Sequence, residues 1–376
     1  MSGRYGTRFG FEFTPSPPGF EPVVGMLSAM MDRPLQPPAF TNPDAATLDS
    51  IEFAGLGMPP SEITLAEVLT RQGYHTAHIG KWHLGEENGM APHDQGFAES
   101  LLMGSGLYGR LDDEDIIQAS REDFDALSHI ELHPERVYAA MIRSLDRGVG
   151  RVLEALKANG LDGNTLVIFT SDNGGAGYIG LPNVNAPYRG WKSTLFEGGI
   201  RVPFLARWPA GLPAGETFDA PVHHVDIYAT AAAAAGADLP PDRIMDGVDL
   251  RPYVTGSKRM DLPHEYLYFR GGAAQAVRDK RWKLVVSAPP PSPRKESDRK
   301  QSPRKEWLFD LTAEGERVDL LAKHPEVASR LRGALEAHNA AQAEPLWPWI
   351  TTKATNIDRD LSQEDQPEDE FAYMSN

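Results

Sequence analysis

Five side chains in this sequence have the chemistry to hold an anion beside a metal ion. Two of them, Asp172 and Asn173, stand in TSDNGG, between a short apolar run and two glycines. Carboxylate and amide oxygens are hard ligands, which suit Ca²⁺ or Mg²⁺ better than a soft metal. Because ligands of open α/β sheets bind beyond the carboxyl ends of strands, we expect both side chains at such a site. The competing interpretation is an Asn-Gly turn closed by a side-chain hydrogen bond, the common role of an isolated DNG tripeptide.

The other three side chains are basic and lie among glycines on either side of that run. Lys81 and His83 stand two residues apart in GYHTAHIGKWHLG (residues 73–85), so an extended chain points both to one side. Lys192 lies in YRGWKSTLFEGGIRVP (residues 188–203). A surface lysine and a structural histidine are the alternative for the first pair, since histidine is often structural.

The elements that must position these residues follow from the apolar pattern. Residues 166–169 are a continuous hydrophobic block after a turn signal, which predicts a strand buried on both faces. Apolar residues three and four apart predict an amphipathic helix over 135–160 that packs on the core. The remaining predicted elements of this part are a helix over 61–72 with Ser61 as its N-cap, strands over 74–79 and 202–206, and a helix over 226–235.

The character of the chain changes beyond residue 256. Four short strands and then one helix predict a small antiparallel sheet with a helix on one face. These elements span 265–269, 274–278, 282–286, 307–310 and 325–337. We therefore expect an α/β domain over 1–256 and an α+β subdomain over 257–345. Residues 288–305 form a low-complexity loop that we expect to be disordered, and 346–376 form an acidic tail without regular structure.

Composition excludes several classes of partner. The chain has 376 residues, a net charge of −16 and no cysteine. The negative charge argues against nucleic acids and anionic membranes as partners, and any bound anion needs a local pocket of positive charge. The sequence contains no apolar run of about 18 residues, so it predicts no membrane span. The first 30 residues do not resemble a signal peptide. Localisation and oligomeric state stay open.

Together the motifs around residues 73–85, 170–175 and 188–203 resemble the sulfatase family, the calcium-dependent sulfate ester hydrolases of the alkaline phosphatase superfamily. The resemblance continues through HHVDIYAT, DGVDLRPYVTG and AVRDKRWKLV, and covers most of residues 1–340. It implies an α/β fold with an alkaline-phosphatase-like mixed sheet flanked by helices and the small C-terminal subdomain. It also implies a sulfated small molecule or carbohydrate as ligand. By this resemblance Lys81, His83 and Lys192 contact the sulfate, and Asp172 and Asn173 bind Ca²⁺.

The sequence departs from the family at its start. Sulfatases use a cysteine or serine in a Cys/Ser-x-Pro-Ser-Arg signature, which is oxidised to formylglycine. This chain opens with MSGRYGTRFGFEF, which is similar to the segment that follows that signature, so Met1 falls downstream of the nucleophile. The preceding strand with its paired aspartates is also missing, and Ca²⁺ takes about six to eight oxygen ligands. We therefore expect a truncated sulfatase without formylglycine, with weak Ca²⁺ binding and no activity of its own.

A second departure lies in residues 104–123. There the family has a hydrophobic strand and a Pro-His-x-Pro loop whose histidine contacts the sulfate, and this sequence has neither. His129 and His133 belong to the next helical segment and do not replace it. Such an internal gap would leave two neighbouring strand edges unpaired. A pseudo-enzyme that binds a sulfated ligand, and a phosphohydrolase of the same superfamily, are the alternative functions.

Overall fold

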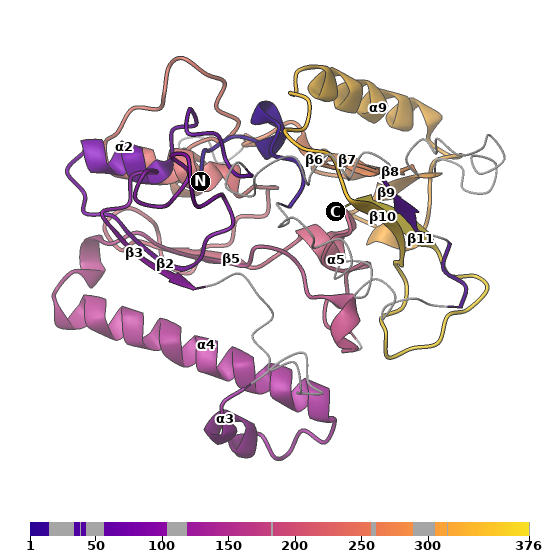
Figure 1. Ribbon diagram of the computed structural model, residues 1–376, viewed down its shortest axis with the longest axis horizontal. Coiled ribbons are helices and arrows are strands. Elements are labelled where there is room, and N and C mark those ends of the chain that lie inside the picture. Colours follow the sequence, from indigo (N-terminus) through magenta and orange to yellow (C-terminus); the bar gives the residue numbers. More distant parts are fainter. Residues whose placement is uncertain are drawn as a thin grey trace.

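The computed structural model describes residues 1–14, 34–37, 39–42, 56–103, 119–181, 183–256, 261–288, 305–313 and 315–375. Within these ranges the chain is a mixed α/β protein, as the sequence predicts (Figure 1). Its strands form a four-stranded sheet, a three-stranded sheet and two separate two-stranded ladders. No helix in the described ranges is both long enough and apolar enough to cross a membrane.

The two ladders carry the candidate site residues. β2 (Ala77–Lys81) pairs in parallel with β3 (Glu99–Met103). β4 (Val167–Thr170) pairs antiparallel with β5 (Phe204–Arg207). Both predicted strands around the site motifs are therefore present, with β2 beginning three residues later than predicted.

Helices α2 (Leu65–Arg71) and α6 (Val225–Ala234) pack together through the buried side chains of Val68, Tyr228 and Ala232. The N-cap of α2 is Thr64 and not Ser61, so that prediction is wrong. Thr64 forms a capping box, in which the Glu67 amide donates to the Thr64 hydroxyl over 3.1 Å and the Thr64 amide donates to the Glu67 carboxylate over 2.7 Å. The other helical elements are η1 (Gly6–Phe9), α3 (Arg121–Ala126), α4 (His133–Ala158), η4 (Asp162–Asn164), η5 (Gly177–Ile179), α5 (Glu197–Ile200), α7 (Arg251–Thr255) and η6 (Gly315–Arg317).

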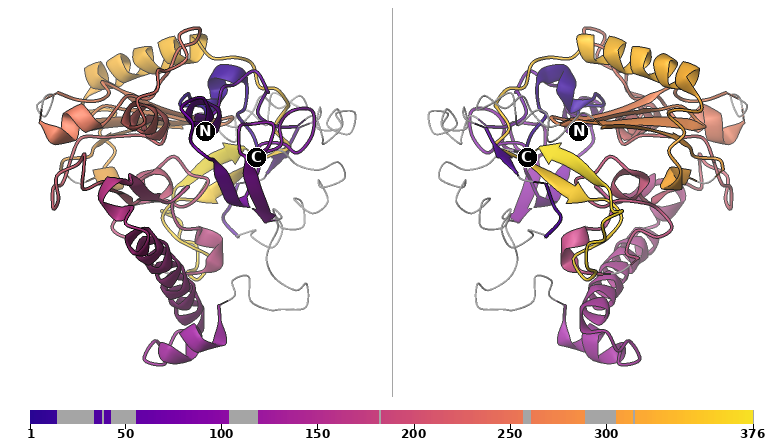
Figure 2. Two further views of the ribbon diagram at one scale, coloured as in Figure 1. Left: turned by 90° about the vertical axis from the view of Figure 1, so that its left-hand side faces the viewer. Right: turned by 90° about the vertical axis from the view of Figure 1, so that its right-hand side faces the viewer.

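The C-terminal subdomain confirms the predicted antiparallel sheet with a helix on one face. Its strands are β6 (Leu267–Gly271), β7 (Ala274–Arg278), β8 (Trp282–Ser287) and β9 (Lys305–Asp310). Helix α9 (Pro325–Ala340) lies across the sheet (Figure 2). Leu331 and Leu335 of this helix are buried against Val277, Leu284 and Leu308 of the strands. The predicted disordered loop falls almost entirely on residues outside the described ranges.

The expectation that residues 346–376 lack regular structure is wrong. They contain β10 (Thr351–Asn356) and β11 (Phe371–Ser375), an antiparallel pair that β1 (Phe40–Thr41) extends. Alternate residues of β10 are buried, which is the pattern of a strand with one face on a core. The acidic residues that suggested a solvated tail lie mainly in the loop between the two strands. There Asp369 pairs with Arg359, and Asp358 pairs with Arg189.

The apolar residues of the two ladders and of α4 are less buried than predicted. Phe169 is exposed, so β4 is not covered on both faces, and its cross-strand neighbour Leu205 is 59% exposed. In the other ladder, Ile79 is 76% exposed beside the exposed Leu101. Helix α4 was expected to pack on the core along its length, but it stands at the edge of the molecule (Figures 1 and 2). Its exposed apolar side chains are Met141, Ile142, Leu145 and Val152.

These exposed side chains predict measurable self-association. We expect the chain to bind the dye ANS at neutral pH and to sediment as a concentration-dependent mixture, because exposed apolar surface of this kind promotes association. The double substitution Ile79→Lys and Leu205→Lys should lower both signals. It should change the free energy of unfolding by no more than about 0.5 kcal/mol, the usual range for surface substitutions. Unfolding of the double variant would show instead that these side chains are buried.

Candidate active site

The loop after β4 is fixed against helix α5 by backbone contacts. The Gly174 amide donates to the Gly199 carbonyl over 3.0 Å, and the Ser171 hydroxyl donates to the Asn173 carbonyl over 2.8 Å. A Cβ atom on Gly174 would lie 1.7 Å from the Gly198 carbonyl oxygen. Glycine is therefore required here because the two backbones touch, and the loop leaves β4 in one defined path.

The same loop holds the segment that carries Lys192. The Lys192 amide donates to the Gly175 carbonyl over 3.0 Å. The Asn185 side chain supports this contact, since its amide group donates to the carbonyls of Gly175 and Gly190 over 2.9 and 3.0 Å. The backbone of Lys192 therefore lies beside the loop that carries Asp172 and Asn173 at the end of β4.

Lys81 and His83 flank a buried tryptophan at the end of β2. Lys81 is the last residue of the strand and is exposed, while His83 is half-buried. The Trp82 indole donates to the carbonyls of Gly85 and Met90 over 2.8 and 3.1 Å, and this fixes the chain just after the strand. Among the described residues, no backbone hydrogen bond joins this segment to the loop of Asp172.

His224 is a residue of this site that the sequence analysis did not single out. Its Nε2 atom lies 3.1 Å from the Thr170 hydroxyl at the end of β4. Burial lowers the pKa of His224, the nearby Asp172 carboxylate acts to raise it, and the N-terminal amine acts to lower it. The histidine stands in HHVDIYAT, a motif that belonged to the resemblance but had no role assigned within it.

The N-terminus of the chain lies at the same place. Burial lowers the pKa of the Met1 amine, although the side chain of Met1 is exposed. The Met1 carbonyl accepts a hydrogen bond of 3.0 Å from the amide of Leu65, at the start of α2. The amine also acts to lower the pKa of His224, so the two groups influence each other electrostatically.

The donors for a metal ion are of the right kind but few. Asp172 is exposed and its carboxylate oxygens are hard ligands. The Asn173 side-chain amide donates to the Gly174 carbonyl over 2.9 Å, which leaves its oxygen available as a ligand. In the described ranges, no group of three or more histidine, aspartate or glutamate side chains could hold a metal ion. These residues fit part of a Ca²⁺ shell, and other oxygens must complete it.

A buried ionic cluster joins the Lys192 segment to the C-terminal sheet. Lys283 of β8 is fully buried, with its Nζ atom 2.9 Å from Glu197 Oε1 and 2.8 Å from Glu316 Oε1. The Glu197 amide donates to the other Glu316 oxygen over 2.6 Å. Burial acts to raise the pKa of Glu197, but the charges of Lys283 and Arg278 outweigh it and hold that pKa below its usual value. Burial raises the pKa of Glu316. Lys283 thus pairs with both carboxylates, and Arg278 also pairs with Glu197 over 3.1 Å.

Comparison with known proteins gives the same family as the motifs. The Sulfatase family model matches residues 110–237. N-acetylgalactosamine-6-sulfatase of Mus musculus is 30% identical over 282 residues, which are 59% of this chain and 54% of that protein. Steryl-sulfatase of Rattus norvegicus is 33% identical over 242 residues, which are 57% of this chain and 41% of that protein. The chain therefore spans about half the length, or less, of the curated relatives it matches.

Solved structures share the fold. The crystal structure of Ps i-CgsB in complex with k-i-k-neocarrahexaose matches with a TM-score of 0.69 at 23% identity, over 92% of this chain and 82% of that one. The phosphonate monoester hydrolase SpPMH from Silicibacter pomeroyi matches with a TM-score of 0.56 at 15% identity, over 92% of this chain and 85% of that one. The family model, the curated relatives and the fold agree with the motifs, and they confirm the resemblance of this chain to the sulfatase family.

Proposed function

We propose that this chain binds a sulfated carbohydrate as part of a sulfuric ester hydrolase. The observation that carries the proposal is the hydrogen bond between the Lys192 amide and the Gly175 carbonyl. It places the segment of a basic side chain at the same end of β4 as Asp172 and Asn173, which is the juxtaposition that a sulfate beside a cation requires. The carbohydrate is supported by the name of the N-acetylgalactosamine-6-sulfatase relative and by the neocarrahexaose bound to a structure of the same fold.

The chain's own residues would act by neutralising the negative charge of the sulfate group and by binding the cation. Lys192 and Lys81 would neutralise sulfate oxygens, and fixed positive groups of this kind stabilise charge that develops as an ester bond breaks. His83 would donate to the sulfate or to the nucleophile. Asp172 and Asn173 would hold Ca²⁺, which when bound polarises the sulfate oxygens.

The nucleophile is the part that this sequence does not supply. The chain has no cysteine, and no serine in it is followed by Pro-Ser-Arg. Removing a nucleophile that acts as a unit with its base costs about 10⁶-fold in rate in well-studied enzymes. We therefore propose that this polypeptide alone binds its sulfated ligand without turnover.

The test is direct binding of a sulfated sugar. In ligand-observed NMR titrations, N-acetylgalactosamine 6-sulfate should bind at least about tenfold more tightly than N-acetylgalactosamine, since lysines pair with the sulfate charge. Lys192→Ala should abolish that preference, and Lys323→Ala, which removes an exposed lysine of the C-terminal subdomain, should leave it intact. Equal binding of the two sugars, or a preference that survives Lys192→Ala, would refute the proposal.

The same preparation allows the metal prediction to be checked. Calorimetric titration with Ca²⁺ should show no tight site, because Asp172 and Asn173 supply at most about three of the roughly six to eight oxygens that the ion takes. Addition of Ca²⁺ should improve binding of the sulfated sugar, and Asp172→Ala should remove that improvement. A micromolar dissociation constant that Asp172→Ala abolishes would mean that further ligands exist.

A further inference from the structure

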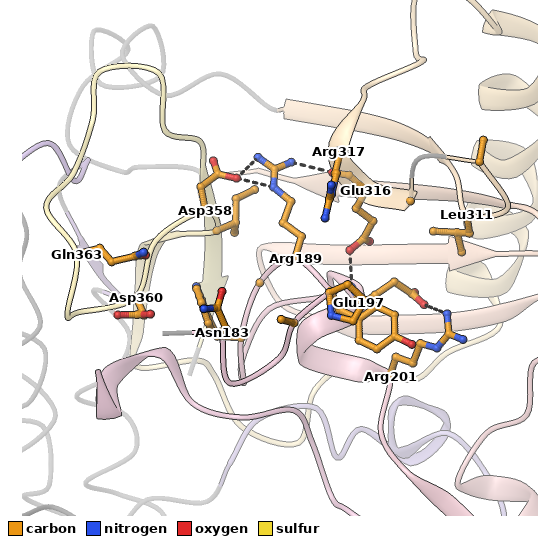
Figure 3. Close-up of a pocket in the computed structure, with 18 residues that line it drawn as sticks. Asn183, Arg189, Glu197, Arg201, Leu311, Glu316, Arg317, Asp358, Asp360 and Gln363 are labelled. Carbon is orange, nitrogen blue, oxygen red and sulfur yellow. Dashed lines mark hydrogen bonds and ion pairs between the residues drawn. The ribbon is translucent and has the colours of Figure 1, made fainter. Parts of the chain in front are cut away.

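A cavity lies beside the segment that carries Lys192. Its volume is about 770 Å³, which is in the range of pockets that bind small molecules. Four parts of the chain line it, namely the loop from Asn183 to Trp191, helix α5 with the residue after it, the turn after β9 with η6, and the loop that follows β10 (Figure 3). It therefore lies between the α/β part of the molecule and the C-terminal strands.

The walls of this cavity are fixed by ion pairs that are already complete. The Arg189 guanidinium lies 2.6 Å from an Asp358 carboxylate oxygen and 2.8 Å from Glu370. Glu197 and Glu316 belong to the buried cluster around Lys283. These groups shape the cavity, and their charges are balanced by protein partners (Figure 3).

Two further arginine side chains on the cavity wall form fewer ion pairs with the protein than Arg189 does. Arg317 is exposed and has no ion pair with any other residue in the ranges that the structure describes. The side chain of Arg201 is 54% exposed, with its guanidinium 4.7 Å from the centre of the Tyr188 ring and 3.7 Å from Glu197. That distance is too long for a hydrogen bond, so Arg201 keeps donors for another partner. Guanidinium forks match carboxylate and sulfate groups in geometry.

The rest of the lining suits hydroxyl groups. Asn183 contributes an amide group to the lining, while the Asp360 carboxylate from the loop after β10 is buried and already accepts hydrogen bonds from the amide and hydroxyl of Ser362. Amide groups both donate hydrogen bonds to sugar hydroxyls and accept hydrogen bonds from them. A ligand with one anionic group and several hydroxyls fits this lining better than a neutral sugar, because a neutral sugar would leave Arg317 and Arg201 without an anionic partner.

The cavity is connected to the candidate active site through one loop. Trp191 lines the cavity and is buried, and its indole donates to the Asn356 carbonyl over 3.0 Å. The next residue is Lys192, whose amide is bonded to Gly175. A carbohydrate held in the cavity would therefore contact the same loop that presents the lysine.

We infer that this cavity binds an acidic sugar unit of the carbohydrate ligand, with Arg317 and Arg201 on its carboxylate or sulfate group. The inference rests on the proposed function for the choice of a carbohydrate. It assigns the recognition of an uncleaved unit to residues outside the five that the motifs identified.

Ligand-observed NMR titrations with D-glucuronate and D-glucose test the inference, because the two sugars differ in one carboxylate. Glucuronate should bind at least about tenfold more tightly, since charge-assisted hydrogen bonds to guanidinium are stronger than neutral ones. Arg317→Gln and Arg201→Gln should each reduce this preference, and together they should remove it. Arg207→Gln, at an exposed arginine of β5 outside the cavity lining, is the matched control and should have no effect. Thermal melts of each variant check that the fold is intact.

The Lys192→Ala variant distinguishes binding in this cavity from binding at the proposed sulfate site. Glucuronate binding should persist in Lys192→Ala. Binding that is lost in Lys192→Ala but unchanged in both arginine variants would place the sugar at the candidate active site and overturn the inference. Equal binding of glucose and glucuronate would overturn it as well. Arginine-dependent binding of glucuronate, without any preference for the 6-sulfated sugar, would leave the cavity assigned and refute the proposed function instead.

Discussion

Adding a segment with the paired aspartates and a Cys-x-Pro-Ser-Arg signature ahead of Met1 is expected to convert a non-hydrolysing chain into an active one. The amine of Met1 acts on the pKa of His224, which contacts Thr170 at the end of β4, so we expect residues joined to Met1 to extend near the candidate active site. The added aspartates would supply the missing Ca²⁺ ligands, and the cysteine would supply the formylglycine. Loss of such a nucleophile costs about 10⁶-fold in rate, and its return should recover a measurable part of that factor.

The measurement is turnover of 4-nitrophenyl sulfate after co-expression with the formylglycine-generating enzyme. The matched control is the same added segment with alanine in place of its cysteine, which should be inactive. Lys81→Ala and Lys192→Ala should each suppress the activity. Turnover that survives both lysine substitutions would come from a contaminant, whereas turnover by the unextended chain that both substitutions abolish would contradict our prediction of inactivity.

The extended chain should remain slow for a separate reason. The sequence around 104–123 lacks the Pro-His-x-Pro loop of the family, and a positioned acid or base contributes about 10²–10⁴ in rate. A further variant that also carries a family-like strand and this loop near residue 118 should be faster by that factor. Equal rates for the two extended variants would show that the second departure does not affect catalysis.

Lys283→Met is expected to cause the largest loss of stability among single substitutions around the site. The lysine is fully buried between Glu197 and Glu316, which are buried as well. Removing one member of a buried ionic group leaves charge without compensation and costs about 3–5 kcal/mol. That loss is a large part of the roughly 5–15 kcal/mol by which a typical domain is stable.

Urea denaturation followed by tryptophan fluorescence measures this loss. Lys323→Met, at an exposed lysine of the same subdomain, should change the free energy of unfolding by less than about 1 kcal/mol. Combining Lys283→Met with Glu197→Gln and Glu316→Gln should recover part of the loss, because the unpaired charges are then removed too. A loss below about 1 kcal/mol for Lys283→Met alone would mean that water or rearrangement compensates the two carboxylates.

The cluster also explains why the site depends on the C-terminal subdomain. Glu197 begins α5, whose glycines touch the loop of Asp172, and Lys283 and Glu316 come from the C-terminal part of the chain. Loosening the cluster would free the segment that carries Lys192. The subdomain therefore contributes to positioning the site through Lys283 of the AVRDKRWKLV motif, although none of the five candidate site residues belongs to it.

Local signals were sufficient for several predictions. Strand β7 has the predicted bounds, and helix α9 begins at the predicted proline, because turn residues and apolar spacing mark them within a few positions. The five candidate site residues were predicted in the same way, from motifs long enough to be read without a structure, and their roles stay predictions. The family also followed from these motifs and is confirmed by the comparisons.

The remaining features are decided only by the tertiary structure. The burial of a side chain and its distance from other residues depend on segments that lie far apart in the sequence. His224 joins the site through contact with Thr170 and the charges of Asp172 and the N-terminus, and nothing in its local pattern shows this. The strands β10 and β11 were missed because their acidic loop dominates the composition, while the pairing of β10 with β1 spans more than 300 residues. The exposure of Phe169 was not predicted either. An apolar run predicts a strand, but whether both faces are covered depends on which other strands and helices reach it.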